Sequence, residues 1–121
     1  MMTMNEAAIQ CEIVKYLQSL GIFCHSIPNE AGGRSAMMQM QLISMGLRPG
    51  VGDLIVWWRL PTGGTRLGYL EIKTATGKQS EYQIKFEKRC HNAGVGYAVC
   101  RSVADVKEYM RLLGIDGGAY R

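Results

Sequence analysis

Glu71 and Lys73 stand two residues apart in the segment GYLEIK, residues 68–73. Side chains two positions apart on a β-strand share one face, so this carboxylate and this ammonium group are predicted neighbours. Asp53 opens a second apolar segment, DLIVWW, directly after the glycine-containing PGVG. Pairing of the two segments as adjacent strands would bring two carboxylates and a lysine together.

Two carboxylates from neighbouring strands suit a hard divalent cation such as Mg²⁺ or Mn²⁺, which takes oxygen ligands and keeps waters and phosphate oxygens in its shell. Such a cation polarises a phosphodiester and lowers the pKa of a water that attacks phosphorus. Lys73 can orient that water or stabilise the developing negative charge. The alternative is an ordinary surface ion pair between Glu71 and Lys73, which contributes little to stability.

The opening segment, residues 5–21, predicts a helix with Asn5 as its N-cap and Gly21 as its stop. At 100° per residue, Glu6 falls within the apolar stripe of this helix, whereas Glu12 falls outside it. Gln10, one turn after Glu6, lies at the edge of the same stripe. We therefore expect Glu6 and Gln10 to face the carboxylate site from the helix.

The rest of the chain predicts further elements in a regular order. A strand is expected over 22–28, a methionine-rich helix over 36–46 that fills a core or a subunit contact, and a β-hairpin over 53–73. Ser80 and Gln83 form a capping box that opens a helix over 80–94, followed by a strand over 95–100 and a helix over 102–114. This order predicts an α/β fold with a mixed sheet covered by helices, in one domain over residues 1–121.

Composition narrows the class of protein. The net charge of +4 and the pI near 9.0 favour a polyanionic partner. The sequence contains no apolar run long enough to cross a bilayer and no secretory signal pattern, so a soluble, cytoplasmic location without a membrane partner is expected. Its four cysteines stand far apart, which predicts free and mostly buried thiols.

The segments GLRPGVGDLIVWW, GYLEIK and GKQSEYQIKF, in this order, resemble the VRR-NUC family of the PD-(D/E)XK nuclease superfamily. The E…IQ pattern of the opening helix and the PNE segment belong to the same resemblance, which covers most of the chain. It implies a restriction-endonuclease-like fold of order α-β-(α)-β-β-α-β-α and a Mg²⁺- or Mn²⁺-dependent deoxyribonuclease. One departure is Gly52, which stands where proline commonly precedes the aspartate.

The resemblance also implies roles for individual residues. Asp53, Glu71 and the main-chain carbonyl of Ile72 would hold the metal, Lys73 would be the catalytic lysine, and Glu6 or Gln10 would complete the site. Gln83 has two readings, since its capping box accounts for it fully and the family pattern places it near the active site. Two loop residues that would help to shape the site are Asn29 and Glu30.

The same resemblance implies a DNA substrate, branched like a four-way junction, and a homodimer similar to junction-resolving enzymes. The candidates for phosphate contacts, each of which is otherwise an ordinary solvated charge, are Arg34, Arg48, Lys78, Lys85, Lys88 and Arg89. The alternatives are a non-catalytic nucleic-acid-binding module and a subunit of a larger replication or repair assembly. Metal-dependent cleavage discriminates between the enzyme and the binding module.

Overall fold

The computed structural model describes residues 4–27 and 35–115. Helices and strands follow one another in the predicted order α-β-α-β-β-α-β-α, which confirms the predicted fold class. They are α1 (Glu6–Ser19), β1 (Cys24–Ser26), α2 (Ala36–Ser44), β2 (Leu54–Arg59), β3 (Thr65–Ile72), α3 (Glu81–Ala93), β4 (Gly96–Cys100) and α4 (Val103–Leu112).

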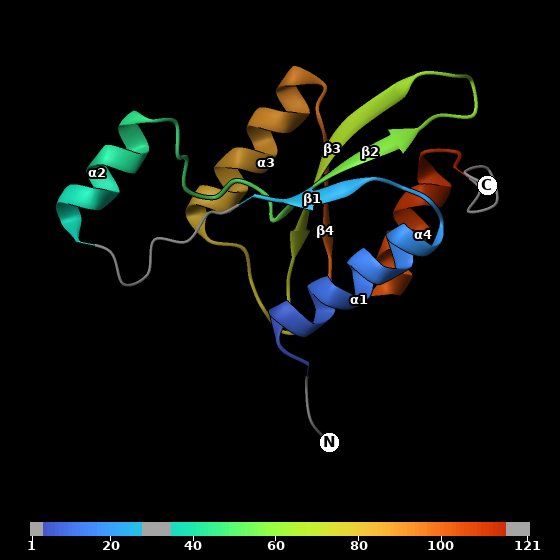
Figure 1. Cartoon of the computed structure of the whole chain (residues 1–121), viewed down its shortest axis with the longest axis horizontal. Helices are drawn as coiled ribbons and strands as arrows, with labels where there is room; N and C mark the ends of the chain where they lie inside the picture. Colours follow the sequence, from blue (N-terminus) through green and yellow to red (C-terminus); the bar gives the residue numbers. More distant parts are fainter. Residues whose placement is uncertain (1–3, 28–34, 116–121) are drawn as a thin grey trace.

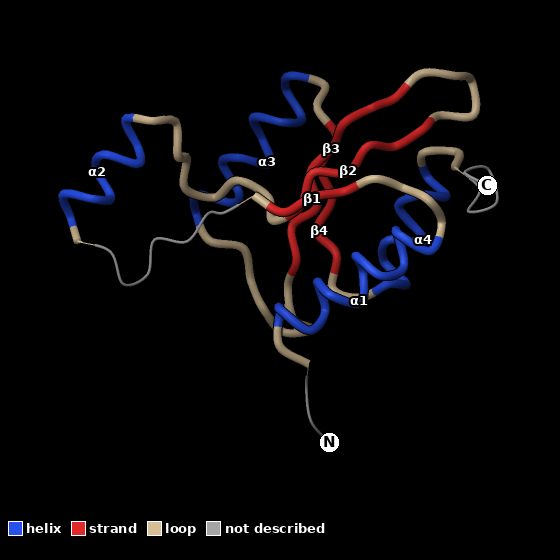
Figure 2. The backbone as a smooth tube through the Cα atoms, in the orientation of Figure 1, coloured by secondary structure: helices blue, strands red, loops and turns tan. Residues whose placement is uncertain are grey.

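The four strands form one mixed sheet in the order β1-β2-β3-β4. β2 pairs antiparallel with both β1 and β3, and β4 lies parallel to β3 after the crossover through α3. The β2–β3 register sets Ile55 opposite Tyr69, as the predicted hairpin requires. Figure 2 shows the strands gathered between α3 and the pair α1 and α4.

One face of the sheet carries the hydrophobic core. α1 and α4 lie side by side against this face (Figure 1). Alternate residues of β2 and β3 point into the core, and each fully buried aliphatic side chain there contributes about 1.5–3 kcal/mol. The strand residues are Leu54, Val56, Trp58, Leu70 and Ile72, and the helix residues include Ile9, Ile13, Leu17, Val106 and Met110.

The opposite face of the sheet is covered by α3. Phe86 of α3 packs edge-on against Tyr69 with ring centroids 4.9 Å apart, and against Tyr97 at 6.0 Å. Since side chains alternate along β3, Glu71 shares this face with Tyr69. The carboxylate therefore lies under α3, on the side of the sheet away from the main core.

The predicted N-caps of α1 and α3 are present, and β1 is shorter than predicted. The side chain of Asn5 accepts a hydrogen bond of 2.8 Å from the main-chain nitrogen of Ala8, at the start of α1. Ser80 and Gln83 form a complete capping box at the start of α3. β1 is shorter than the predicted 22–28, because Phe23 and Ile27 on either side of it contribute one isolated main-chain hydrogen bond each to the β2 segment.

The methionine-rich helix α2 stands apart from the rest of the chain (Figure 1). None of its residues is buried, and the exposed fractions of Met37, Met40 and the C-cap residue Met45 are 80%, 69% and 76%. The expectation that these methionines fill a core is therefore wrong for the described chain. The subunit contact, the other half of that expectation, is taken up below.

The four cysteines are free, as predicted, but they are not mostly buried. Cys90 and Cys100 are buried, Cys24 is half-buried and Cys11 is exposed.

Among the helices that the structure describes, none combines the length and the apolar character needed to cross a membrane.

Candidate active site

Asp53 ties β2 to the end of β3. Its main-chain nitrogen donates to the carbonyl oxygen of Leu70 at 2.9 Å, and its Oδ2 accepts from the main-chain nitrogen of Ile72 at 2.6 Å. A side-chain oxygen thus continues the ladder of main-chain hydrogen bonds beyond Leu54, the first residue of β2. This arrangement fixes the Asp53 carboxylate beside the strand that carries Glu71.

Close packing against β3 explains why a glycine, Gly52, precedes the aspartate where the family commonly has proline. A Cβ atom at this position would lie 2.9 Å from the Cβ of Tyr69, closer than non-bonded carbon atoms approach one another. The absence of a side chain lets the segment before β2 lie directly on β3. Asp53 therefore reaches its place through close packing that a proline ring would obstruct.

Glu71 is buried, with an exposed fraction of 1%. Its Oε2 accepts a hydrogen bond of 2.9 Å from Nε2 of Gln83, and its Oε1 accepts a long one of 3.5 Å from the hydroxyl of Tyr97. Lys73 forms no ion pair within 4.0 Å in the described parts of the chain. A carboxylate so enclosed is not half of a surface ion pair, and that alternative is excluded.

The electrostatics of the site centre on Glu71. The pKa of Glu71 is raised to about 8, first by burial and then by the side-chain hydrogen bond and the like charge of Asp53. Lys73 acts in the opposite direction, and the charge of Glu6 adds a smaller increase. Without a cation, the site therefore favours a proton on this pair of carboxyl groups at neutral pH.

Gln83 completes its predicted capping box and also lies against Glu71. Its Oε1 accepts from the main-chain nitrogen of Ser80 at 2.8 Å, which completes the capping box. Its Nε2 simultaneously donates to Glu71. One amide therefore uses its acceptor for the helix and its donor for the buried carboxylate.

Lys73 is the first residue after β3. Its main-chain nitrogen donates to the carbonyl oxygen of Cys100 at 3.1 Å, and its side chain is half-buried. Arg101 fixes the following turn, since its Nη1 donates to the carbonyl oxygens of Thr74 at 2.6 Å and Gly77 at 2.7 Å. Sequence reasoning missed Arg101, because only the parallel pairing of β4 with β3 brings it to this turn.

A second missed group extends the network away from Glu71. Gln79 donates to the hydroxyl of Tyr97 at 3.2 Å and to Oε1 of Glu87 at 3.4 Å. Burial and the nearby charge of Glu71 raise the pKa of Tyr97, so the phenol stays neutral and can donate to that carboxylate. The signal in the sequence was faint, since a tyrosine in an apolar strand is ordinary core composition.

Glu6 and Gln10 are placed differently from each other. Glu6 is exposed on the first turn of α1, and its charge is felt at Glu71. Gln10 is half-buried and lines a hollow between α1 and β1, with Cys24 and Leu54 among its neighbours. Within the described residues neither Glu6 nor Gln10 makes a hydrogen bond to a site carboxylate, so the expectation that one of them completes the site stays a prediction.

The predicted phosphate-binding residues are partly assembled on one helix. Lys85, Lys88 and Arg89 are exposed on α3, and Lys78 is exposed on the loop before it. Arg48 is exposed, but its Nη1 donates to the carbonyl oxygens of Ile43 and Leu47, both at 3.0 Å, at the end of α2. The predicted residues that lie outside the described chain are Asn29, Glu30 and Arg34.

The donor set fits a hard divalent cation. The described residues contain no cluster of three or more histidine, cysteine, aspartate or glutamate side chains placed to hold a metal. Mg²⁺ commonly uses one or two carboxylates together with waters and substrate oxygens, and the Asp53 and Glu71 pair supplies two. Because burial and the like charge of Asp53 disfavour the ionised form of Glu71, a cation held by the two carboxylates would offset that cost.

A family model for the VRR-NUC domain matches residues 4–104. The chain belongs to the VRR-NUC family. VRR-NUC is a family of nuclease domains, and the matched residues of this VRR-NUC domain include Asp53, Glu71 and Lys73.

Two solved structures have the fold of this VRR-NUC domain. One, described as "VRR_NUC domain protein", is 16% identical with a TM-score of 0.69, and the match covers 100% of this chain and 99% of the other. The second, described as "VRR_NUC domain", is 21% identical with a TM-score of 0.59, covering 88% and 94%. A comparison with curated proteins finds no match.

Proposed function

We propose that this VRR-NUC domain is a Mg²⁺- or Mn²⁺-dependent deoxyribonuclease that hydrolyses phosphodiester bonds. The observation that carries the proposal is the buried Glu71 beside Asp53, with its pKa raised to about 8 in the absence of a cation. Asp53, Glu71 and the Ile72 carbonyl would hold the ion. When bound, a divalent cation polarises the phosphodiester and stabilises the negative charge that develops on it.

The protein's own residues have separate tasks in this proposal. Lys73 orients the attacking water in line with the scissile bond and offsets negative charge at phosphorus. Gln83 and Tyr97 hold Glu71 in one orientation, because each donates to a different oxygen of its carboxylate. Glu6 adds a carboxylate from α1 at the edge of the site.

The proposal is tested by cleavage of labelled linear, flapped and four-way-junction DNA with Mg²⁺, Mn²⁺ or EDTA. We expect cleavage only with a divalent ion, and a loss of at least about 100-fold in Asp53→Asn and Lys73→Ala. Lys107→Ala is the matched control, since this lysine lies on α4 above the ring of Tyr16. Cleavage in EDTA, or unchanged cleavage by both folded site variants, would contradict the proposal.

The same cleavage experiment tests the two alternative functions, a non-catalytic binding module and a subunit of a larger assembly. A non-catalytic nucleic-acid-binding module would bind the DNA with or without a metal and would cut none of the substrates. A subunit of a larger replication or repair assembly would gain cleavage activity only when its partner proteins are added. The enclosed carboxylate pair favours the enzyme, because a phosphate-binding surface by itself has no use for buried acids.

We infer further that the domain acts as a homodimer on branched DNA, with a second copy of the chain seated on α2. Residues 36–46 contain no charged side chain, so a two-fold contact of this surface with itself meets no like-charge repulsion. A mostly apolar hollow lies between the end of α2 and the sheet, and it can receive methionines of a second copy. Its lining includes Leu42, Met45, Leu47, Val51, Ile55 and Phe86.

Sedimentation velocity tests this dimer directly. We expect a dimer for the unchanged chain and a monomer when Met37→Lys and Met40→Lys are combined. Leu112→Lys, at an exposed position on α4, is the matched control and should remain dimeric. A monomer of the unchanged chain at assay concentrations, or equal cutting of linear and branched DNA, would contradict the dimer or the branch preference respectively.

A further inference from the structure

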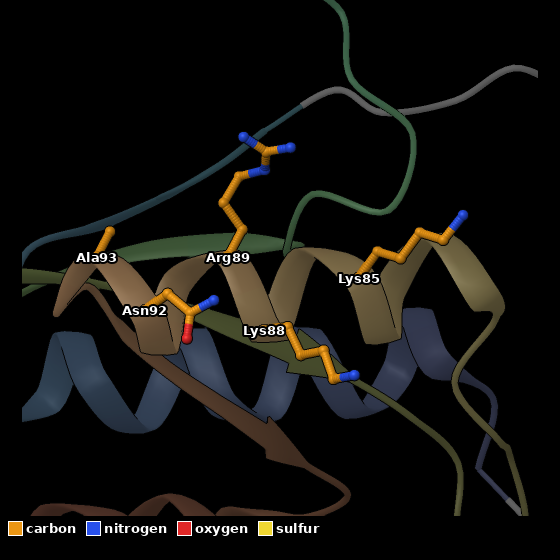
Figure 3. A pocket seen from close by; sticks show the side chains of 5 residues that line it. All are labelled: Lys85, Lys88, Arg89, Asn92 and Ala93. Atoms are coloured by element: carbon orange, nitrogen blue, oxygen red, sulfur yellow. The ribbon is translucent and has the colours of Figure 1, made fainter.

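Three cations lie close together on the outer side of α3. Lys85, Lys88 and Arg89 are three and four positions apart, so they lie on neighbouring turns of one helix surface. Figure 3 shows Lys85 and Arg89 extending from the same side of the helix. Among the described residues, none of the three forms an ion pair with a carboxylate within 4.0 Å. Their positive charge is available to an anionic partner.

Lys85 and Arg89 stand between two hollows. The first is completed by Lys88, Asn92 and Ala93 (Figure 3). The second, of about 300 Å³, is completed by residues of α3 and of the turn before β2. Those residues are Arg48, Pro49, Tyr82 and Phe86.

The second hollow is held open by close packing. A Cβ atom at Gly50 would collide with the main chain of Tyr82, so the turn that carries Pro49 lies directly on the first turn of α3. Phe86 is fixed by its edge-on contacts with Tyr69 and Tyr97. Close packing therefore positions two parts of the wall of this hollow, the turn with Pro49 and the ring of Phe86.

The exposed ring of Tyr82 favours single-stranded over double-stranded nucleic acid as the ligand. Its side chain is 60% exposed, and in the described chain it has no aromatic partner. An exposed ring beside two or three cations is the combination with which proteins bind single-stranded nucleic acid, because the cations follow the phosphates and the ring stacks on a base. A paired duplex offers its phosphates but keeps its bases out of reach of such a ring.

The hollow also adjoins the carboxylate site through α3. Gln83, the residue after Tyr82, donates to Glu71. Lys85 follows Gln83 by two residues, about 3 Å along the helix axis and 200° around it, so Lys85 is exposed on the side of α3 away from Glu71. A strand bound on Lys85 and Tyr82 would pass around the start of α3 to bring a phosphate to the carboxylates.

We propose that α3 and the turn before β2 hold an unpaired stretch of the substrate strand, with phosphates on Lys85 and Arg89 and a base stacked on Tyr82. The proposal rests on the nuclease function in one respect, namely that the bound strand is the one presented to Asp53 and Glu71. It adds a requirement for unpaired nucleotides beside the cleavage site.

Binding measured in EDTA tests the proposal without cleavage. Fluorescence anisotropy would follow a labelled oligothymidylate and a blunt duplex of equal length. We expect Tyr82→Ala to weaken binding of the single strand about 5- to 100-fold and to change duplex binding less than twofold. Tyr82→Phe keeps the ring and should bind the single strand like the unchanged chain.

Salt dependence tests the cations separately. Combining Lys85→Ala with Arg89→Ala should lower the slope of log affinity against log salt by about 1.4, the value expected for two phosphate contacts on a single strand. Lys107→Ala on α4 should leave the slope unchanged. An unchanged slope in the double variant would remove the phosphate contacts from the proposal.

The outcomes keep this site distinct from the catalytic proposal. Selective loss of single-strand binding in Tyr82→Ala supports the site even if no substrate is ever cut. Metal-dependent cleavage together with normal single-strand binding by Tyr82→Ala would leave the nuclease in place and overturn the site. Equal loss of single-strand and duplex binding would also overturn it.

Discussion

Gln83 donates a hydrogen bond of 2.9 Å to Oε2 of Glu71, and so joins the first turn of α3 to the buried carboxylate on β3. The same side chain caps the helix through Ser80. The start of α3 and the orientation of Glu71 therefore depend on one amide group. Removing that amide should affect the helix and the chemistry together, whereas removing the cap by itself should affect only the helix.

Gln83→Ala and Ser80→Ala separate these two effects. Each loses part of the capping box and should lower the free energy of unfolding by about 1 kcal/mol. Only Gln83→Ala removes a donor from Glu71, so its DNA cleavage rate should fall about 10- to 100-fold, while Ser80→Ala stays within threefold. Urea unfolding and initial cleavage rates are the measurements. Equal rates for the two variants would show that the contact with Glu71 has no catalytic role.

The pH dependence of stability should report the Glu71 carboxyl group. Burial and Asp53 raise its pKa from 4.5 to about 8 in the folded protein, so between these values the folded chain keeps a proton that the unfolded chain releases. In EDTA the free energy of unfolding should therefore decrease as pH rises from 4.5 to 8, by up to about 1.4 kcal/mol per pH unit. Urea titrations across this range provide the measurement.

Two changes should remove that pH dependence. Glu71→Gln has no titrating group, and saturating Mn²⁺ favours the ionised carboxylate, so either should flatten the decrease. Glu12→Gln, at an exposed position on α1, is the control and should keep it. Parallel curves for Glu71→Gln and the unchanged chain would assign the pH dependence to other groups.

Gly50 should be more sensitive to a side chain than Gly46. Both have positive φ angles, +84° and +112°, so alanine is strained at either position by about 1 kcal/mol. At Gly50 the new Cβ also collides with the main chain of Tyr82, whereas at Gly46 it meets open space. Thermal or urea unfolding should show Gly50→Ala to be less stable than Gly46→Ala by about 1–3 kcal/mol. Equal losses would mean that α3 shifts at no cost.

Arg101→Lys should loosen the turn that follows Lys73. A lysine keeps the charge but loses the planar guanidinium group whose Nη1 donates to the carbonyl oxygens of Thr74 and Gly77. The cleavage rate should fall at least about tenfold through misplacement of Lys73. Arg111→Lys, which affects only the exposed pair with Glu108, is the matched control and should cleave normally. A normal rate for Arg101→Lys would separate this turn from catalysis.

Much of this arrangement follows from local rules that the sequence displays. Helical periodicity, N-caps at Asn5 and Ser80, and glycine stops define the helices, and the two apolar segments around PTGGT define the hairpin. Because side chains alternate along strands, the sequence predicts that Asp53, Glu71 and Lys73 converge. Asp53 and Glu71 do lie together, since the hairpin register sets their strand ends side by side.

The tertiary structure alone decided the surroundings of that pair. Burial of Glu71, the contacts of Tyr97 and the hold of Arg101 on the turn after β3 all depend on the parallel crossover, which joins residues 24 to 27 positions apart in sequence. Exposure of α2 likewise depends on whether another element covers it, and in the described chain none does. Periodicity and capping report contacts within a few residues, whereas the environment of a side chain is set by distant elements whose packing no local pattern encodes.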